Sequence, residues 1–128
     1  MNTLISFELK VLLFKKGFRY ELSHSYDPEL GGTRVNHSLA EQRWNEGDLT
    51  YVDITIADVV MWLYEKHGIW VSVKTIKWNY EHNTIRFNYN ICKFNHNNSS
   101  DITDVVYDFN SPTEAYEAAI EYTLKNLI

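Results

Sequence analysis

At 128 residues, with 45% hydrophobic and 23% charged residues, the chain has the composition of one globular domain rather than that of a disordered segment. Its formal net charge of −5 disfavours a non-specific nucleic-acid binder, because such proteins need a basic surface to displace counterions from phosphates. Its single cysteine, Cys92, excludes an internal disulfide bond and a thiolate metal cluster. We therefore expect a single domain over residues 1–128.

The first residues predict neither a signal peptide nor a membrane anchor. Glu8 and Lys10 interrupt the first apolar run, and no basic segment comes before it. No apolar stretch approaches the roughly 20 residues that a membrane helix needs. The sequence therefore predicts a soluble, cytoplasmic protein that does not bind membranes.

Residues 3–16 fit two patterns. From Ile5 to Val11 apolar and polar residues alternate, as in a strand. A helical stripe is equally present, formed by Leu4, Phe7, Val11 and Phe14. Strong helix formers and the stop signal Lys15-Lys16-Gly17 favour a helix, with Thr3 as its N-cap.

Residues 18–26 alternate clearly, which predicts a strand with His24 on its buried face. Asp27-Pro28 and the two glycines after it predict a turn. Residues 33–39 are then interpreted as a returning strand, and the mostly polar residues 40–50 as a loop.

A second helix is predicted after Thr55, where Thr55 and Asp58 have the spacing of a capping box. Gly68 is placed to end this helix in the left-handed conformation, and His67 is interpreted as a partner of the helix dipole. The apolar stripe consists of Ile56, Val59, Val60 and Leu63.

Residues 69–94 predict a β-hairpin, with its turn at His82-Asn83. One register opposes apolar to apolar side chains throughout. Val71 and Val73 are out of phase with it, which predicts a bulge near Lys74 or a strand buried on both faces. The opposed pairs are Ile76 with Tyr89, Trp78 with Phe87, and Tyr80 with Ile85.

The rest of the chain reads as a polar loop over residues 95–100, a short strand over 104–109 and a terminal helix. Ser111 and Glu114 have capping-box spacing, and Pro112 suits the first helical position. The helix stripe should pack on the hairpin face formed by Ile76, Trp78, Phe87 and Tyr89; its members are Tyr116, Ile120, Leu124 and Leu127. The resulting fold class is α+β, a meandering, mostly antiparallel sheet covered on one face by about three helices.

No motif predicts a metal, a cofactor or a reaction. The five histidines lack metal-ligand spacing; they are His24, His37, His67, His82 and His96. His24 and Cys92 are the candidates for an alternative reading as a small hydrolase or transferase. A reactive Cys92 would need a nearby base or cation, so an inert buried thiol is favoured.

Two further groups have a structural interpretation beside a functional one. On the terminal helix, Glu114 caps, Glu117 is solvated and Glu121 pairs with Lys125, so these carboxylates predict no hydrolase site. The hairpin aromatics could stack single-stranded nucleic acid or carbohydrate, but core packing is favoured because the cations lie on the opposite face. These aromatics are Trp70, Trp78, Tyr80, Phe87 and Tyr89.

Three segments, residues 12–18, 55–73 and 110–128, together about a third of the chain, resemble a family of short uncharacterised proteins. These proteins occur in gut bacterial genomes and in their phages or integrated elements. The resemblance implies an accessory role in a phage or mobile element, and it brings no activity, ligand or catalytic residue.

We therefore expect a non-enzymatic protein that acts by binding another protein. The sequence names no partner and carries no signal for an oligomeric state.

Overall fold

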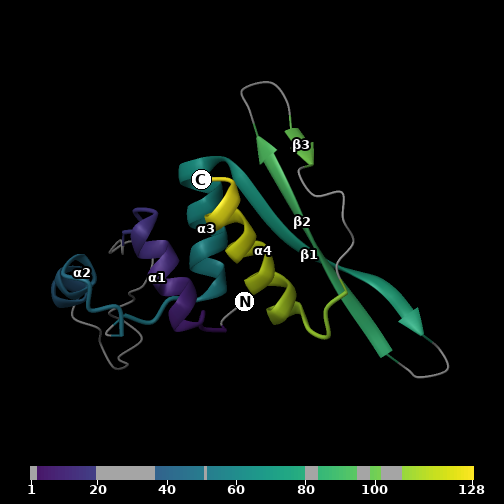
Figure 1. The fold of residues 1–128 in the computed structure, drawn as a ribbon, viewed down its shortest axis with the longest axis horizontal. Helices are drawn as coiled ribbons and strands as arrows, with labels where there is room; N and C mark the ends of the chain where they lie inside the picture. Colours follow the sequence, from purple (N-terminus) through teal and green to yellow (C-terminus); the bar gives the residue numbers. More distant parts are fainter. Residues whose placement is uncertain (1–2, 20–36, 51, 80–83, 95–98, 102–107) are drawn as a thin grey trace, which may run out of the picture.

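A computed structural model describes residues 3–19, 37–50, 52–79, 84–94, 99–101 and 108–128. The described part has four helices and a three-stranded antiparallel sheet, so the fold class is α+β, as predicted (Figure 1). In chain order the elements are α1 (Phe7–Lys15), α2 (His37–Asn45), α3 (Ile56–His67), β1 (Ile69–Asn79), β2 (Thr84–Phe94), β3 (Ser99–Asp101) and α4 (Pro112–Asn126).

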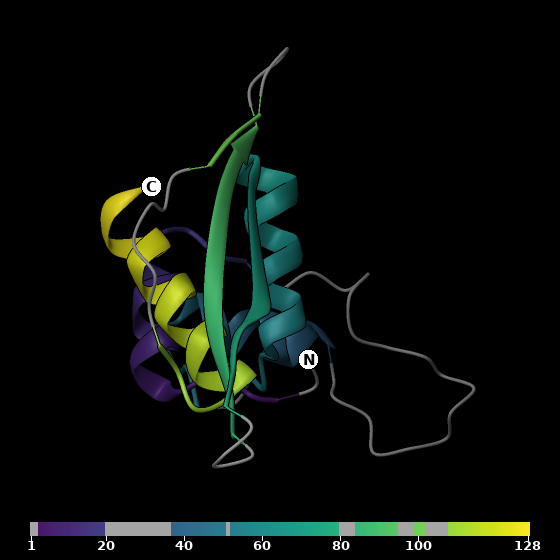
Figure 2. The same ribbon diagram turned by 90° about the vertical axis from the view of Figure 1, so that its right-hand side faces the viewer.

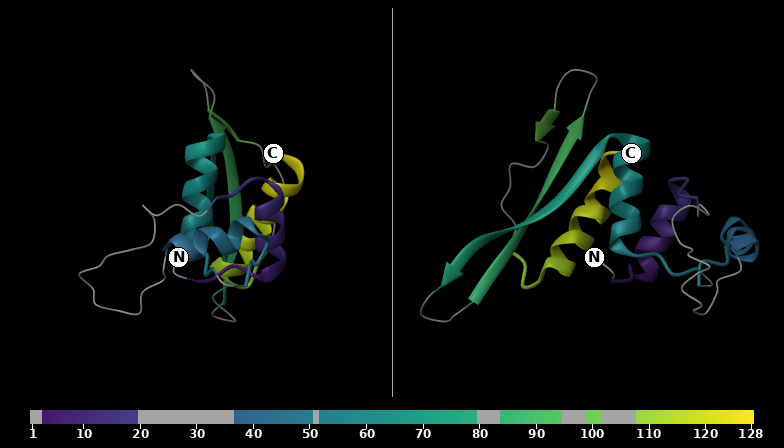
Figure 3. Two further views of the ribbon diagram at one scale, coloured as in Figure 1. Left: turned by 90° about the vertical axis from the view of Figure 1, so that its left-hand side faces the viewer. Right: turned by 180° about the vertical axis from the view of Figure 1, so that it is seen from behind.

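The elements form layers. The strands lie in the order β1-β2-β3, and α3 and α4 pack on one face of the β1–β2 hairpin (Figure 2). Helix α1 packs on α4, on the side away from the sheet, and α2 lies beyond α1 (Figures 1 and 3). Helices α3 and α4 therefore cover the sheet directly, and α1 and α2 form layers beyond them.

Helix α1 begins later than predicted. Its N-cap is Ser6, whose hydroxyl accepts a hydrogen bond from the Leu9 amide at 3.3 Å, so the assignment of Thr3 as cap was wrong. Residues 3–5 are instead extended along the segment before α3. The Ile5 amide donates to the Ile54 carbonyl, and the Ile56 amide donates to the Thr3 carbonyl, each at 2.9 Å. Of the segment that fitted both patterns, residues 3–5 are therefore extended, and the helix begins at Phe7.

Helix α2 contradicts both the returning strand at residues 37–39 and the loop at residues 40–45. Trp44 anchors this helix: its side chain is fully buried and its indole N–H donates to the Phe18 carbonyl at 2.7 Å. The Trp44 ring packs edge-on against Phe14 and Phe18. Of the α2 side chains that the structure describes, residues 41–45, Trp44 is the buried one and the others are exposed, which explains why this stretch has the polar composition of a loop. Of the predicted strand 18–26, Phe18 and Arg19 are not in a strand, and the rest lies outside the described residues.

Helix α3 agrees with its prediction. Thr55 and Asp58 form the expected capping box, with bonds of 3.0 and 3.2 Å. Gly68 ends the helix with φ of 64°. At Gly68 a Cβ would lie 3.1 Å from the Phe94 carbonyl oxygen, so this position needs glycine for space as well as for conformation.

The hairpin is present, but its predicted register is wrong. Val71 pairs with Ile91, Val73 with Tyr89, and Trp78 with Ile85 rather than with Phe87. Val71 is buried and Val73 packs partly buried against the core, which fixes the side of β1 that faces the helices. A bulge between Thr75 and Lys77 then shifts the pairing by one residue. The observed bulge lies next to Lys74, where a bulge was one of two predicted explanations. The predicted register is wrong because it relies on the apolar residues that follow the bulge.

The segment before α4 is partly as predicted. Ser99 and Ser100 belong to β3 and pair with Phe94 and Lys93, so the predicted polar loop ends earlier than expected. Of the predicted strand at 104–109, residues 104–107 lie outside the described part. Phe109 forms an isolated bridge to Phe87, with reciprocal backbone bonds of 2.9 and 3.0 Å.

Helix α4 begins at Pro112 as predicted, and the Ser111 hydroxyl accepts from the Glu114 amide at 3.2 Å. Glu114 accepts a bond from the Asn110 amide, not from the Ser111 amide, so the capping box is modified. On the core side Ile120 and Leu124 are fully buried, and α4 contacts both β1 and β2. Of the hairpin face expected beneath α4, Tyr89 is buried and Phe87 is half-buried, whereas the side chains of residues 76 and 78 lie outside the described part.

Substitution of Trp44 tests whether α2 is part of the core. Trp44→Phe leaves the Phe18 carbonyl without its donor in a buried setting, which should lower the free energy of unfolding by about 1–3 kcal/mol. Trp44→Ala also leaves a cavity and should cost about 3–5 kcal/mol. Urea denaturation measures both. A cost for Trp44→Ala below about 1 kcal/mol would place α2 outside the cooperative core.

Substitution of Ser111 tests the start of α4. Ser111→Ala removes the oxygen that caps the Glu114 amide and should lower stability by about 0.5–2 kcal/mol. Ser111→Asn keeps a capping oxygen and serves as the matched control, with little expected change. Thermal and urea unfolding of the three proteins provide the comparison. Equal stability of the alanine and asparagine variants would contradict a capping role.

Candidate functional site: a groove between α1 and α4

An open groove of about 710 Å³ runs between α1 and α4. Side chains of both helices line it, and the α4 residues follow helical spacing, so they form one stripe along about three turns. The lining from α1 and its cap is Ser6, Phe7, Glu8, Leu9, Val11 and Leu12, and that from α4 is Glu114, Glu117, Ala118, Glu121 and Lys125.

Packing at several points positions the two walls. Leu9 and Leu13 are buried on the inner side of α1, and Ala119 and Ile120 are buried on the inner side of α4. The two helices run in the same direction (Figure 1), and at their C-terminal ends the Lys16 ammonium donates to the Ile128 carbonyl oxygen at 2.6 Å. The walls are therefore held by the core, while the groove stays open between them.

The groove has an apolar wall on α1. Phe7 is 52% exposed, although a phenyl ring is normally well covered. Val11 and Leu12 are half-buried and continue the apolar surface along the helix. Exposed and half-buried apolar side chains that line a groove form a candidate binding surface.

The rim of the groove is acidic. Glu8 lies on α1, and Glu114, Glu117 and Glu121 lie on α4. Lys125 is the lining cation, and it pairs with Glu121 at 2.6 Å, as predicted. Glu117, which was predicted to be solvated, is half-buried and lines the open groove.

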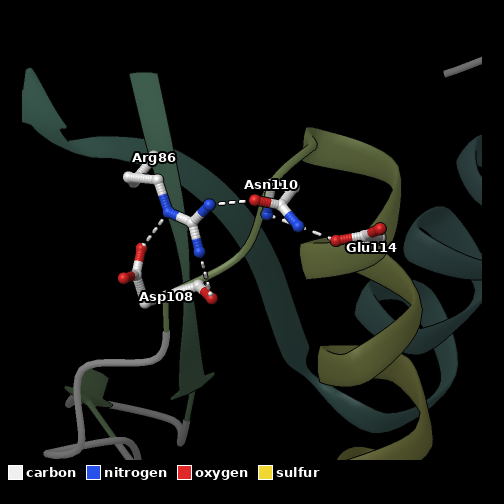
Figure 4. A network of polar contacts seen from close by, with 4 residues as sticks. All are labelled: Arg86, Asp108, Asn110 and Glu114. Atoms are coloured by element: carbon white, nitrogen blue, oxygen red, sulfur yellow. Dashed lines mark hydrogen bonds and ion pairs between the residues drawn. The ribbon is translucent and has the colours of Figure 1, made fainter. Parts of the chain in front are cut away.

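A polar network fixes the Glu114 end of the groove (Figure 4). Arg86 on β2 donates to the Asp108 carboxylate at 2.5 Å, to the Asp108 carbonyl at 3.2 Å and to the Asn110 side-chain oxygen. The Asn110 amide then donates to Glu114 at 3.2 Å. This network connects the hairpin to the first turn of α4, so it holds one acidic residue of the rim in place.

The described members of the hairpin aromatic set, for which core packing was favoured over a stacking platform, do not form one exposed surface. Tyr89 is in the core and Phe87 is half-buried, whereas Trp70 is 38% exposed. The side chain of Trp78 and all of Tyr80 lie outside the described residues. Trp70 instead joins Tyr64 of α3, whose ring also packs edge-on against Phe94.

The candidate catalytic residues gain no support from geometry. Cys92 is half-buried on β2, opposite Trp70 on one side and Asp101 on the other. Within the described part of the chain, no hydrogen bond joins Cys92 to a base. His24, His82 and His96 lie outside the described residues, as does the side chain of His37. The described residues contain no cluster of three or more His, Cys, Asp or Glu suited to a metal ion.

His67 lies in the last turn of α3, where its ring packs edge-on against Trp62 at a centroid distance of 4.8 Å. Burial removes water from the imidazole and lowers its pKa below the usual value of 6.5. His67 lies in the last turn of α3, where the predicted interaction with the helix dipole would act, and that interaction stays a prediction.

The groove itself was missed by sequence analysis, although α1 carried a signal. Apolar residues occupy more than one side of this short helix: Leu9 and Leu13 face the core, and Phe7, Val11 and Leu12 line or border the groove. A helix that is apolar on two sides needs a second contact. That the second side would meet the glutamates of α4 depends on tertiary packing.

Comparison with known proteins adds no family. No family model, curated protein or solved structure matches this chain. The resemblance to phage and mobile-element proteins therefore stays a prediction. Among the described residues no helix has the length and apolar character required to cross a membrane.

The lowered pKa of His67 has a consequence for stability. Below about pH 6.5 the unfolded chain takes up a proton at His67 more readily than the folded chain, so stability should fall as pH decreases through this range. His67→Gln should remove this contribution, and unfolding from about pH 7 to about pH 5 measures it. Lys66→Gln, next in sequence, is the control that should keep the pH dependence. A parallel pH profile for wild type and His67→Gln would contradict the assignment.

Proposed function

We propose that this is a non-enzymatic protein that binds a helical segment of a partner protein in the groove between α1 and α4. The observation that carries the proposal is the open groove, whose apolar wall includes the half-exposed Phe7 ring. Docking of an amphipathic helix into an apolar groove is a common mode of peptide recognition. The sequence resemblance is what supports a setting in a phage or mobile element.

The dimensions of the groove suit such an occupant. The α4 wall extends from Glu114 to Lys125, which corresponds to roughly 16 Å of helix or about three turns. A ligand helix of that length presents three or four apolar side chains on one face. These could contact Phe7, Val11 and Leu12 together and exclude water from that wall.

The rival functions have weaker support. A hydrolase or transferase would need a base beside Cys92, and the described residues provide none in hydrogen-bond contact. His24 lies outside the described part. A nucleic-acid ligand in the groove would place phosphates beside four glutamates, which like-charge repulsion disfavours. The Tyr64, Trp70 and Phe94 cluster is exposed, but its rings pack edge-on against one another rather than presenting parallel faces.

The test is selection of helical peptides about three turns long from a displayed library with unbiased polar positions, using the full chain as bait. Selected peptides should bind the wild-type protein and lose about tenfold or more in affinity with Phe7→Ala, because a central apolar contact is removed. Tyr64→Ala is the matched control: it truncates an equally exposed aromatic residue on α3, away from the groove.

Binding is measured by fluorescence anisotropy with purified proteins, and circular dichroism checks that each variant is folded. Enrichment of no peptide would contradict the proposal. So would selected peptides whose affinity responds to Tyr64→Ala but not to Phe7→Ala.

A further inference from the structure

We infer that the helix bound in the α1–α4 groove is basic, with an apolar stripe flanked by lysine or arginine residues. The inference rests on the proposed function and adds the chemistry of the partner. It follows from the charges at the rim, whereas the proposed function follows from the apolar wall.

The first step concerns unbalanced charge. Four glutamates and one lysine line the groove, and that lysine is already paired with Glu121. No residue in the described ranges forms an ion pair with Glu8 or Glu117. Covering the groove with an uncharged helix would remove water from these carboxylates without replacing its interactions, which is costly. Cations on the ligand would compensate for that loss.

The second step concerns spacing. On α4, Glu114, Glu117 and Glu121 are three and four positions apart, so they rise along one side by about 4.5 and 6 Å. Cationic residues at the same spacing on a ligand helix would meet them in register. The long stems of Lys and Arg can also lie over the apolar wall while their charged ends reach the rim.

The third step concerns the opposite wall. Glu8 lies on α1, so carboxylates are present on both sides of the groove. A ligand with cations along only one flank would leave Glu8 unmatched. The geometry therefore favours a helix with basic residues on both flanks of its apolar stripe, as in a basic amphipathic helix.

The same charges disfavour other occupants. An acidic peptide, a phosphate group or an anionic lipid surface would meet like charge at the rim. A second copy of this chain carries the same net charge of −5. Self-association through the groove is therefore an alternative outcome of the test and not the expected one.

The experiment uses the full chain and three synthetic helices with an identical apolar face. Their flanking residues are all Lys and Arg, all Gln, or all Glu, and fluorescence anisotropy reports binding at low and at raised salt. The basic peptide should bind about tenfold or more tightly than the Gln peptide, and this advantage should shrink as salt screens the charges. The Glu peptide should bind most weakly.

Two protein variants locate the effect. The double variant Glu8→Gln and Glu117→Gln should weaken the basic peptide about tenfold and leave the Gln peptide nearly unchanged. Glu65→Gln, an exposed glutamate on α3, is the control for non-specific attraction to an acidic protein and should change neither.

Each other outcome has a definite meaning. Equal affinity for the basic and Gln peptides, with both sensitive to Phe7→Ala, would overturn the inference and leave the proposed function standing. Preference for the Glu peptide would overturn it as well. Binding of none of the three would count against the proposed function too. Self-association in sedimentation that is lost with Phe7→Ala would replace the partner helix by a second copy of the chain.

Discussion

Helix α4 packs against other elements on two sides, and the rest of the fold depends on both contacts. Towards the hairpin, Ile120 and Leu124 are fully buried, each contributing about 1.5–3 kcal/mol relative to an exposed side chain. Ala115 and Ala119 are buried as well, and their small size lets neighbouring elements approach the helix backbone. Helix α1 then packs on α4, which creates the groove. Loss of α4 would leave the hairpin without its main cover and α1 without its support.

Where the chain carries complete local signals, sequence and structure agree. The capping box and terminal glycine that set α3, and the Ser111-Pro112 start of α4, depend on residues within one turn of each helix end. Helix α2 was missed because its stability comes from Trp44, whose partners Phe14 and Phe18 are distant in sequence. The register of the hairpin was missed for a related reason. Both sides of β1 carry apolar residues, so the sequence does not show which side faces the core. Contact with the helices decides it.

The candidate site was harder to predict than the fold. Glu121 pairs with Lys125 as predicted, and Glu114 accepts from the Asn110 amide rather than from the predicted Ser111 amide; both contacts are local to the chain around α4. Glu114 and Glu121 line one groove only because α1 lies beside α4, and no residue pattern within α4 predicts that α1 packs there. The excess of apolar residues on α1 was the available clue, since a helix with two apolar sides must cover both or offer one of them to a ligand. Sequence alone could not show that the acidic rim lies beside the apolar side of α1, because this depends on how the two helices pack.

The contact between α1 and α4 also has a consequence for folding. Helix α3, β1 and β2 are contiguous and are closed at one end by the bond between the Phe94 amide and the Gly68 carbonyl, at 2.8 Å. Such short-range structure can form early, because little loop entropy is lost. The groove needs two helices that most of the chain separates, so we expect it to form late. A ligand that recognises both walls binds only the completed fold and, by mass action, withdraws it from exchange with partly folded states. In the cell, the partner of such a protein would also determine how long it escapes proteolysis.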